Sequence, residues 1–225
     1  MPCRRSGGGK LAERVSAEEA QRILIEGNWR FMNGIPMGPN RTPMRRRELV
    51  RGQRPLAAVL GCSDSRVVPE LVFDCGMGDL FVVRLAGNIA DEGALGSIEY
   101  AVDRLGVRLV VVLGHTRCGA VGAVVQNTPY PGHIEHVLGA VRAGMENARA
   151  DPGEGYINCI LANISEAVRN VAGMSEHARE LVRKRELKVI GALYEIETGE
   201  VEFLEEEGAG GQGEPEGQAP PGEGF

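Results

Sequence analysis

The chain has 225 residues, of which 43% are hydrophobic and 25% are charged. This balance is typical of a water-soluble globular protein that is long enough to bury a core without disulfide bonds. No apolar run approaches the ~20 residues of a membrane helix, and the first residues lack the apolar segment of a secretory signal. We therefore expect neither a membrane protein nor an exported one, and we expect the chain to be cytoplasmic.

The net charge of −6 comes from one end of the sequence. Residues 205–225 contain six Glu and no Lys or Arg, and removing them leaves 25 acidic and 25 basic residues. This tail is rich in Gly, Pro and Glu, so we predict that it is disordered. We predict the same for residues 1–15. Residues 16–204 are then expected to form a single domain, with residues 16–54 as an N-terminal helical arm.

The arm shows two helix signals in succession. Ser16 begins a capping box, and apolar residues follow at helical spacing as far as Phe31. The segment 34–39 ends this helix, and Thr42 followed by a proline begins a second one. The arginines of residues 45–51 have no interleaved aromatic residues, so we interpret them as a solvated basic face and expect no nucleic-acid partner.

Beyond the arm, short apolar runs alternate with helical segments. The expected strands are residues 56–60, 80–85, 109–113 and 188–196, and the expected helices are residues 94–105, 117–126, 133–149, 156–171 and 176–185. Continuous apolar runs are typical of parallel strands that are buried on both faces. Their alternation with helices predicts an α/β fold with a central, mostly parallel sheet flanked by helices. A turn at Thr198-Gly199 predicts an antiparallel edge strand at residues 201–204.

Polar residues with metal-binding chemistry follow two of these strands. Cys62 comes after the first strand, and His115 and Cys118 come after the third. Ligand sites in such sheets lie beyond the carboxyl ends of the strands. Two thiolates and an imidazole suit zinc, and three protein ligands leave the fourth position open, as in catalytic zinc sites. Any one of these residues alone is more often structural, so the prediction depends on their combination.

A carboxylate and a guanidinium accompany the first of these cysteines. Asp64 and Arg66 follow Cys62 at intervals of two residues, which places all three on one side of an extended segment. Asp64 could bind the open metal position or accept a hydrogen bond from zinc-bound water. Arg66 could pair with Asp64 through two hydrogen bonds and select between these states. Gly119, beside the second cysteine, would keep the approach to the open position small.

The pattern Cys62-x-Asp64-x-Arg66 followed by His115-x-x-Cys118 resembles the β-class carbonic anhydrases. The similarity covers about residues 16–204. It includes residues 67–70, 78–84, 86–88, 98–102 and 197–199.

This resemblance implies the zinc-dependent, reversible hydration of CO2 to bicarbonate and a proton, through attack by zinc-bound hydroxide. Each subunit would hold one Zn²⁺ through Cys62, His115 and Cys118. Asp64 would either be a fourth ligand in a closed site or pair with Arg66 in an open one, where the two residues orient the reactants.

The resemblance also implies a pocket, a sheet and an assembly. Gly119 and Val83 would line the substrate pocket. The sheet would have four parallel strands and a fifth strand at its edge. The N-terminal helix would reach over a partner subunit, in a homodimer or a dimer of dimers.

Two other functions are compatible with the same ligands. The first is hydrolysis of a CO2 analogue, carbon disulfide or carbonyl sulfide. The second is a non-catalytic zinc-binding scaffold with Asp64 fixed on the metal. A purely structural site has no evident use for Arg66, which argues against the second.

Overall fold

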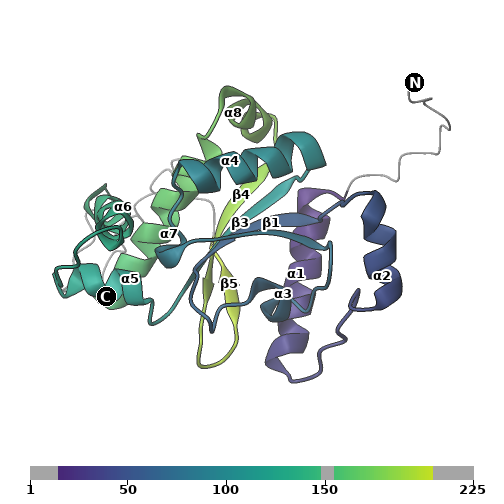
Figure 1. Cartoon of the computed structure of the whole chain (residues 1–225), viewed down its shortest axis with the longest axis horizontal. Coiled ribbons are helices and arrows are strands. Elements are labelled where there is room, and N and C mark those ends of the chain that lie inside the picture. The colour runs from purple at the N-terminus through teal and green to yellow at the C-terminus, as the bar shows by residue number, and fades with distance from the viewer. Residues whose placement is uncertain (1–14, 148–154, 205–225) are drawn as a thin grey trace, which may run out of the picture.

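A five-stranded sheet forms the centre of the fold (Figure 1). The computed structural model describes residues 15–147 and 155–204. The two ends that we predict to be disordered therefore lie, except for Val15, outside the described residues. None of the described helices is long and apolar enough to cross a membrane.

The strands follow the order β2-β1-β3-β4-β5 across the sheet. Their bounds are Ala57–Gly61 for β1, Leu80–Arg84 for β2, Leu109–His115 for β3, Lys188–Tyr194 for β4 and Val201–Phe203 for β5. The first four strands pair in parallel with one another, and β5 pairs with β4 in the antiparallel direction. The predicted α/β fold with four parallel strands and one antiparallel edge strand is confirmed.

The strands are apolar because both faces of the sheet are covered. Every residue of β1 and of β3 is buried. Side chains alternate between the faces, so Val110 and Val112 of β3 pack in one hydrophobic cluster, and Val111 and Leu113 pack in the other. The first cluster includes residues of the helices between β3 and β4, and the second includes α1.

The helices agree with the predicted segments in position but differ at several ends. They are α1 Ala17–Met32, α2 Pro43–Glu48, α3 Pro69–Val72, α4 Glu92–Tyr100, α5 Gly119–Val125, α6 Ile134–Asn147, α7 Tyr156–Ala172 and α8 Glu176–Arg183. Shorter helical turns follow α2 at Leu49–Arg51, β2 at Ala86–Asn88 and α4 at Ala101–Leu105.

Local capping explains the main differences. The helix predicted from residue 94 begins at Glu92, because the Asp91 side chain accepts a hydrogen bond from the Ala94 amide at 2.9 Å. The helix predicted from residue 117 begins at Gly119, because Arg117 has a left-handed φ of 56°. The sequence analysis also missed α3, which has only four residues.

The helix α1 docks on the loop that follows α3. The buried Asn28 side chain donates hydrogen bonds to the carbonyls of Val72 (3.2 Å) and Gly199 (2.8 Å). The Asp74 carboxylate is fully buried and accepts hydrogen bonds from Arg30 Nε at 2.7 Å and from the Met37 amide at 2.9 Å. These contacts hold the start of the arm against the face of the sheet opposite to α7.

This docking requires a glycine in α1. A Cβ atom on Gly27 would lie 1.9 Å from the carbonyl oxygen of Phe73, which is a backbone atom with little freedom to move. We expect Gly27→Ala to lower the free energy of unfolding by about 2 kcal/mol or more through overpacking. Urea titration followed by circular dichroism measures this change.

Gly96 provides a matched control for this substitution. It lies within α4, and a Cβ atom there would have no neighbour within 4 Å. Gly96→Ala should therefore leave stability unchanged or raise it by up to about 1 kcal/mol, the usual gain from alanine in a helix. Equal effects of the two substitutions would contradict the proposed close contact at Gly27.

Candidate metal centre

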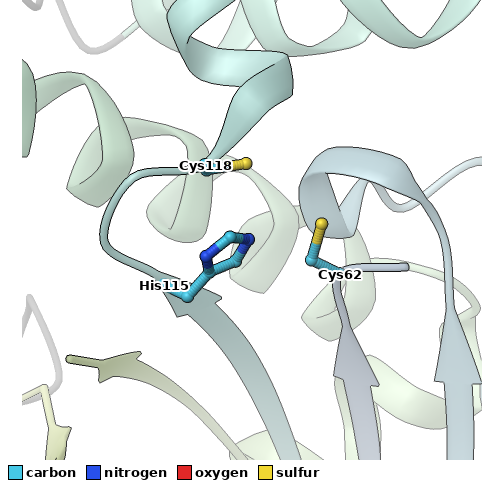
Figure 2. Close-up of side chains that lie close together, drawn as sticks. All are labelled: Cys62, His115 and Cys118. Carbon is cyan, nitrogen blue, oxygen red and sulfur yellow. The ribbon is translucent and has the colours of Figure 1, made fainter. Parts of the chain in front are cut away.

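Cys62, His115 and Cys118 converge at the carboxyl edge of the sheet (Figure 2). Their potential ligand atoms all lie within 4.8 Å of one another, and all three residues are buried. Cys62 directly follows β1, His115 is the last residue of β3, and Cys118 is the residue before α5. Because β1 and β3 are adjacent and parallel, their ends meet at the same edge of the sheet.

The His115 ring is prepared to act as a ligand through Nε2. Its Nδ1 atom lies 2.8 Å from the carbonyl oxygen of Thr116, so Nδ1 carries the proton and Nε2 keeps a free lone pair. Nε2 is buried, and it is one of only two buried side-chain nitrogen or oxygen atoms in the described chain that lack a hydrogen-bond partner. In Figure 2 the ring points toward the space between the two sulfur atoms. A cation at this point would satisfy the unpartnered nitrogen.

The two sulfur atoms differ in their surroundings. The pKa of Cys62 is lowered by a hydrogen bond from the Cys118 thiol, and also by the amides of Asp64 and Gly87, which donate to its Sγ at 3.4 and 3.3 Å. The pKa of Cys118 is raised, because its thiol donates to the Cys62 thiolate and because it is buried. A metal ion that binds both sulfurs would displace this shared proton.

Asp64 is directed to Arg66 in this structure. Arg66 donates to the two carboxylate oxygens through Nε at 2.9 Å and Nη2 at 2.7 Å, and its backbone amide donates at 2.9 Å. These hydrogen bonds from the guanidinium lower the pKa of Asp64 to about 2. The carboxylate is not part of the cluster formed by Cys62, His115 and Cys118. Of the two arrangements considered from the sequence, this is the one in which Asp64 pairs with Arg66.

Sequence reasoning missed several residues that hold this site in place. Arg84 of β2 donates to the carbonyl of Cys62 at 3.0 Å and to that of Asp64 at 2.6 Å, which fixes the loop between these residues. The Tyr156 hydroxyl donates to the carbonyl of Cys118. No spacing rule could reveal these contacts, because each depends on tertiary packing between distant segments.

The predicted substrate-pocket residues lie in different places. An open hollow of about 300 Å³ lies beside Cys118 and is lined also by Gly119, Gln126 and Tyr156. Val83 does not line this hollow; it lies in β2 opposite Leu60 and packs against the first hydrophobic cluster. A role for either residue in substrate binding therefore stays a prediction.

The donor set fits zinc better than the other common metals. Two cysteine sulfurs and one imidazole nitrogen are preferred zinc ligands, whereas magnesium and calcium prefer oxygen. Three protein ligands leave room for a fourth, which distinguishes catalytic zinc sites from closed structural ones.

Comparison with known proteins agrees with this site. Residues 57–201 match the family described as carbonic anhydrase. The chain belongs to this family. It is 38% identical over 184 residues to carbonic anhydrase 2 of Mycobacterium tuberculosis, with coverage of 80% of this chain and 89% of that protein. It is 54% identical over 106 residues to a carbonic anhydrase of Mycolicibacterium smegmatis, covering 47% of this chain and 52% of the other.

Similar solved structures place this carbonic anhydrase in the β class. A structure of tetrameric β-carbonic anhydrases from Sordaria macrospora aligns with a TM-score of 0.65 at 27% identity, covering 72% of this chain and 87% of that one. A Coccomyxa β-carbonic anhydrase in complex with acetazolamide aligns with a TM-score of 0.63 at 25% identity, covering 80% and 84% of the two chains.

The metal assignment predicts different effects for two buried cysteines. We expect Cys62→Ser to lose bound zinc, because a serine hydroxyl is not deprotonated at neutral pH and binds zinc poorly. Cys75→Ser is the matched control, because Cys75 is buried outside the cluster and its thiol donates to the Phe73 carbonyl at 3.4 Å. Elemental analysis of the purified proteins should find about one zinc per chain in the control. Equal zinc content in both variants would contradict the assignment of Cys62.

Proposed function

We propose that this carbonic anhydrase catalyses the reversible hydration of CO2 to bicarbonate and a proton, at a Zn²⁺ ion held by Cys62, His115 and Cys118. The observation that carries the proposal is the convergence of these three donors beside a carboxylate that is paired with Arg66. The relatives reported above are themselves named carbonic anhydrases.

Zinc bound there would act as a Lewis acid and activate water for attack on CO2. The protein contributes by fixing the donors. The Thr116 carbonyl holds the His115 ring with Nε2 unprotonated, and the amides of Asp64 and Gly87 hold the Cys62 sulfur. The site therefore needs little rearrangement when the metal binds.

Asp64 is suited to orient the attacking water. Because its pKa is about 2, the carboxylate is ionised at neutral pH and acts only as a hydrogen-bond acceptor. Each of its oxygens already accepts from Arg66, but a carboxylate oxygen can accept a further hydrogen bond. Arg66 thus keeps Asp64 turned away from the sulfurs and still leaves it able to hold a water molecule. We propose this orienting role for the pair. On the family resemblance we also propose that Gly119, which lines the hollow beside Cys118, and Val83, which lies outside that hollow, contact the substrate.

No observation favours the two alternative functions. Hydrolysis of carbon disulfide or carbonyl sulfide would use the same three ligands, but the relatives reported above carry the name carbonic anhydrase. A non-catalytic scaffold would place Asp64 on the metal, whereas its carboxylate is occupied by Arg66.

We further propose that the protein acts in the cytoplasm as a homodimer or a dimer of dimers. The similar β-carbonic anhydrases from Sordaria macrospora are described as tetrameric. In addition, the arm exposes several large apolar side chains, among them Ile25 (48%), Trp29 (58%), Ile35 (55%) and Met37 (74%), that a second copy could cover. CO2 and bicarbonate are the expected ligands, and neither a nucleic acid nor a membrane is an expected partner.

The initial rate of CO2 hydration tests the proposed activity. It should be measured by stopped flow with a pH indicator, at alkaline pH, on protein with known zinc content. We expect a rate that scales with the zinc content. The absence of any rate in zinc-loaded protein would contradict the proposal, and hydrolysis of carbonyl sulfide by the same sample would then support the alternative.

The role of Asp64 can be tested separately from metal binding. We expect Asp64→Asn to keep its zinc and to lower kcat by about 10²-fold or more, because the amide cannot provide the same charged acceptor. Asp103→Asn is the matched control, since Asp103 lies after α4 and contacts His177 at 3.7 Å. A kcat for Asp64→Asn equal to that of the control would remove Asp64 from the mechanism.

A further inference from the structure

The turn between β4 and β5 is hydrogen-bonded to the loop that carries two of the metal ligands. Thr116 lies in this loop, between His115 and Cys118. Its hydroxyl donates to Glu195 Oε1 at 2.8 Å and accepts from the Ile196 amide at 3.1 Å. These contacts join residues about 80 positions apart in the sequence.

The same threonine orients the metal-binding histidine. Its carbonyl oxygen is the partner of His115 Nδ1, at 2.8 Å, and its amide donates to the Tyr194 carbonyl at 3.0 Å. The direction of the Thr116 carbonyl therefore decides which ring nitrogen is free and where the ring points.

Glu195 is the residue of the β4–β5 turn that accepts the hydrogen bond from the Thr116 hydroxyl. Its Oε1 atom accepts from the Thr116 hydroxyl and also from the Glu197 amide, at 3.1 Å. A threonine hydroxyl has one proton to donate, and in Thr116 that proton is donated to Glu195. The hydrogen bonds from Glu197 and Thr116 also lower the pKa of Glu195, which keeps it an acceptor at neutral pH.

Backbone strain at Arg117 is a second reason why the loop between His115 and Cys118 would shift if the hydrogen bond to Glu195 were lost. Arg117, the next residue, has a left-handed φ of 56°, which costs free energy for a residue other than glycine. Its carbonyl accepts from Arg66 Nη2 at 3.3 Å. A shift of the loop would therefore move a contact of the Asp64–Arg66 pair as well as the ligands.

We propose that Glu195 is a positioning residue for the metal centre, which acts through the Thr116 hydroxyl to hold the His115 ring in its metal-binding orientation. The proposal rests on the proposed zinc site. It assigns to Glu195 a hydrogen-bonding role, so an amide oxygen in the same place should serve nearly as well as a carboxylate.

Zinc release gives a direct test that does not depend on activity. Full-length, zinc-loaded protein is mixed with an excess of a chromogenic zinc chelator, and the rate of zinc transfer is followed by absorbance. We expect Glu195→Ala and Thr116→Val to release zinc about tenfold faster than the parent protein, the usual scale for loss of a partner that orients a metal ligand. Glu195→Gln and Thr116→Ser, which keep the hydrogen bond, should release zinc at nearly the parental rate.

A control in the same turn separates positioning from simple loss of stability. The Thr198 hydroxyl accepts from the Glu200 amide at 3.2 Å and makes no hydrogen bond to the metal loop in the described part of the chain, so Thr198→Ala weakens the turn alone. Urea titration should show comparable loss of stability in Thr198→Ala and Glu195→Ala, but only Glu195→Ala should release zinc faster. In the Co²⁺-substituted protein, the visible absorption bands should shift for Glu195→Ala and remain unchanged for Thr198→Ala.

Three results would overturn the proposal. In the first, Glu195→Ala releases zinc at the parental rate. In the second, Thr198→Ala accelerates release as much as Glu195→Ala does. In the third, Glu195→Gln is as fast as Glu195→Ala, which would make charge rather than the hydrogen bond responsible. A parent protein that hydrates CO2 would leave the proposed function intact in all three cases, whereas a parent protein that binds no zinc would remove both proposals.

Discussion

The metal centre depends on the parallel pairing of β1 with β3. Register places Gly61 opposite Leu113, so the chain leaves both strands at the same edge, with Cys62 on one side and His115 on the other. Side chains alternate between the faces of a sheet, so a slip of one residue in either strand would direct its ligand away from the other. The buried apolar side chains on both faces of these strands oppose such a slip. The hydrophobic core thus fixes the geometry of the metal centre, whose two cysteines belong to the first hydrophobic cluster.

The strands and the ligand motifs could be predicted from sequence because their signals are local. Each buried strand is a continuous apolar run, and the rule that ligand sites lie at strand ends then selects Cys62, His115 and Cys118. The hydrogen bonds that form between distant segments, by contrast, have no local signal in the sequence. Arg84 reaches the carbonyl of Cys62, and Tyr156 reaches that of Cys118, only after the chain has folded. Arg84 lies within a segment that resembles the family, but neither its spacing from Cys62 nor that of Tyr156 from Cys118 predicts these contacts.

Val83 and the start of α5 are two further places where the folded structure adds to what the sequence predicts. The family resemblance suggests Val83 as a pocket residue; it lies in β2, packs against the first hydrophobic cluster and does not line the hollow beside Cys118, so its role stays a prediction. Arg117 was expected within a helix, but its left-handed backbone delays the helix until Gly119. This delay places Cys118 directly before α5, where the hydrogen bond to Cys62 and burial raise the pKa of its thiol, and the amides of Ala120 and Val121 lower that pKa by less. The departure from the simple helical pattern therefore has a chemical consequence at the metal centre.

Arg66 links the two loops that supply the ligands. Its side chain contacts Asp64 in the loop after β1 and the carbonyl of Arg117 in the loop after β3. For Asp64 to rotate toward the sulfurs, it would have to give up both hydrogen bonds from this guanidinium, so its position depends on how firmly the second loop holds Arg66. That loop is in turn restrained by the turn after β4, through Thr116 and Glu195. The orientation of the carboxylate and the orientation of the histidine are therefore coupled, because the same short loop carries the Thr116 carbonyl that contacts His115 and the Arg117 carbonyl that contacts Arg66, the partner of Asp64.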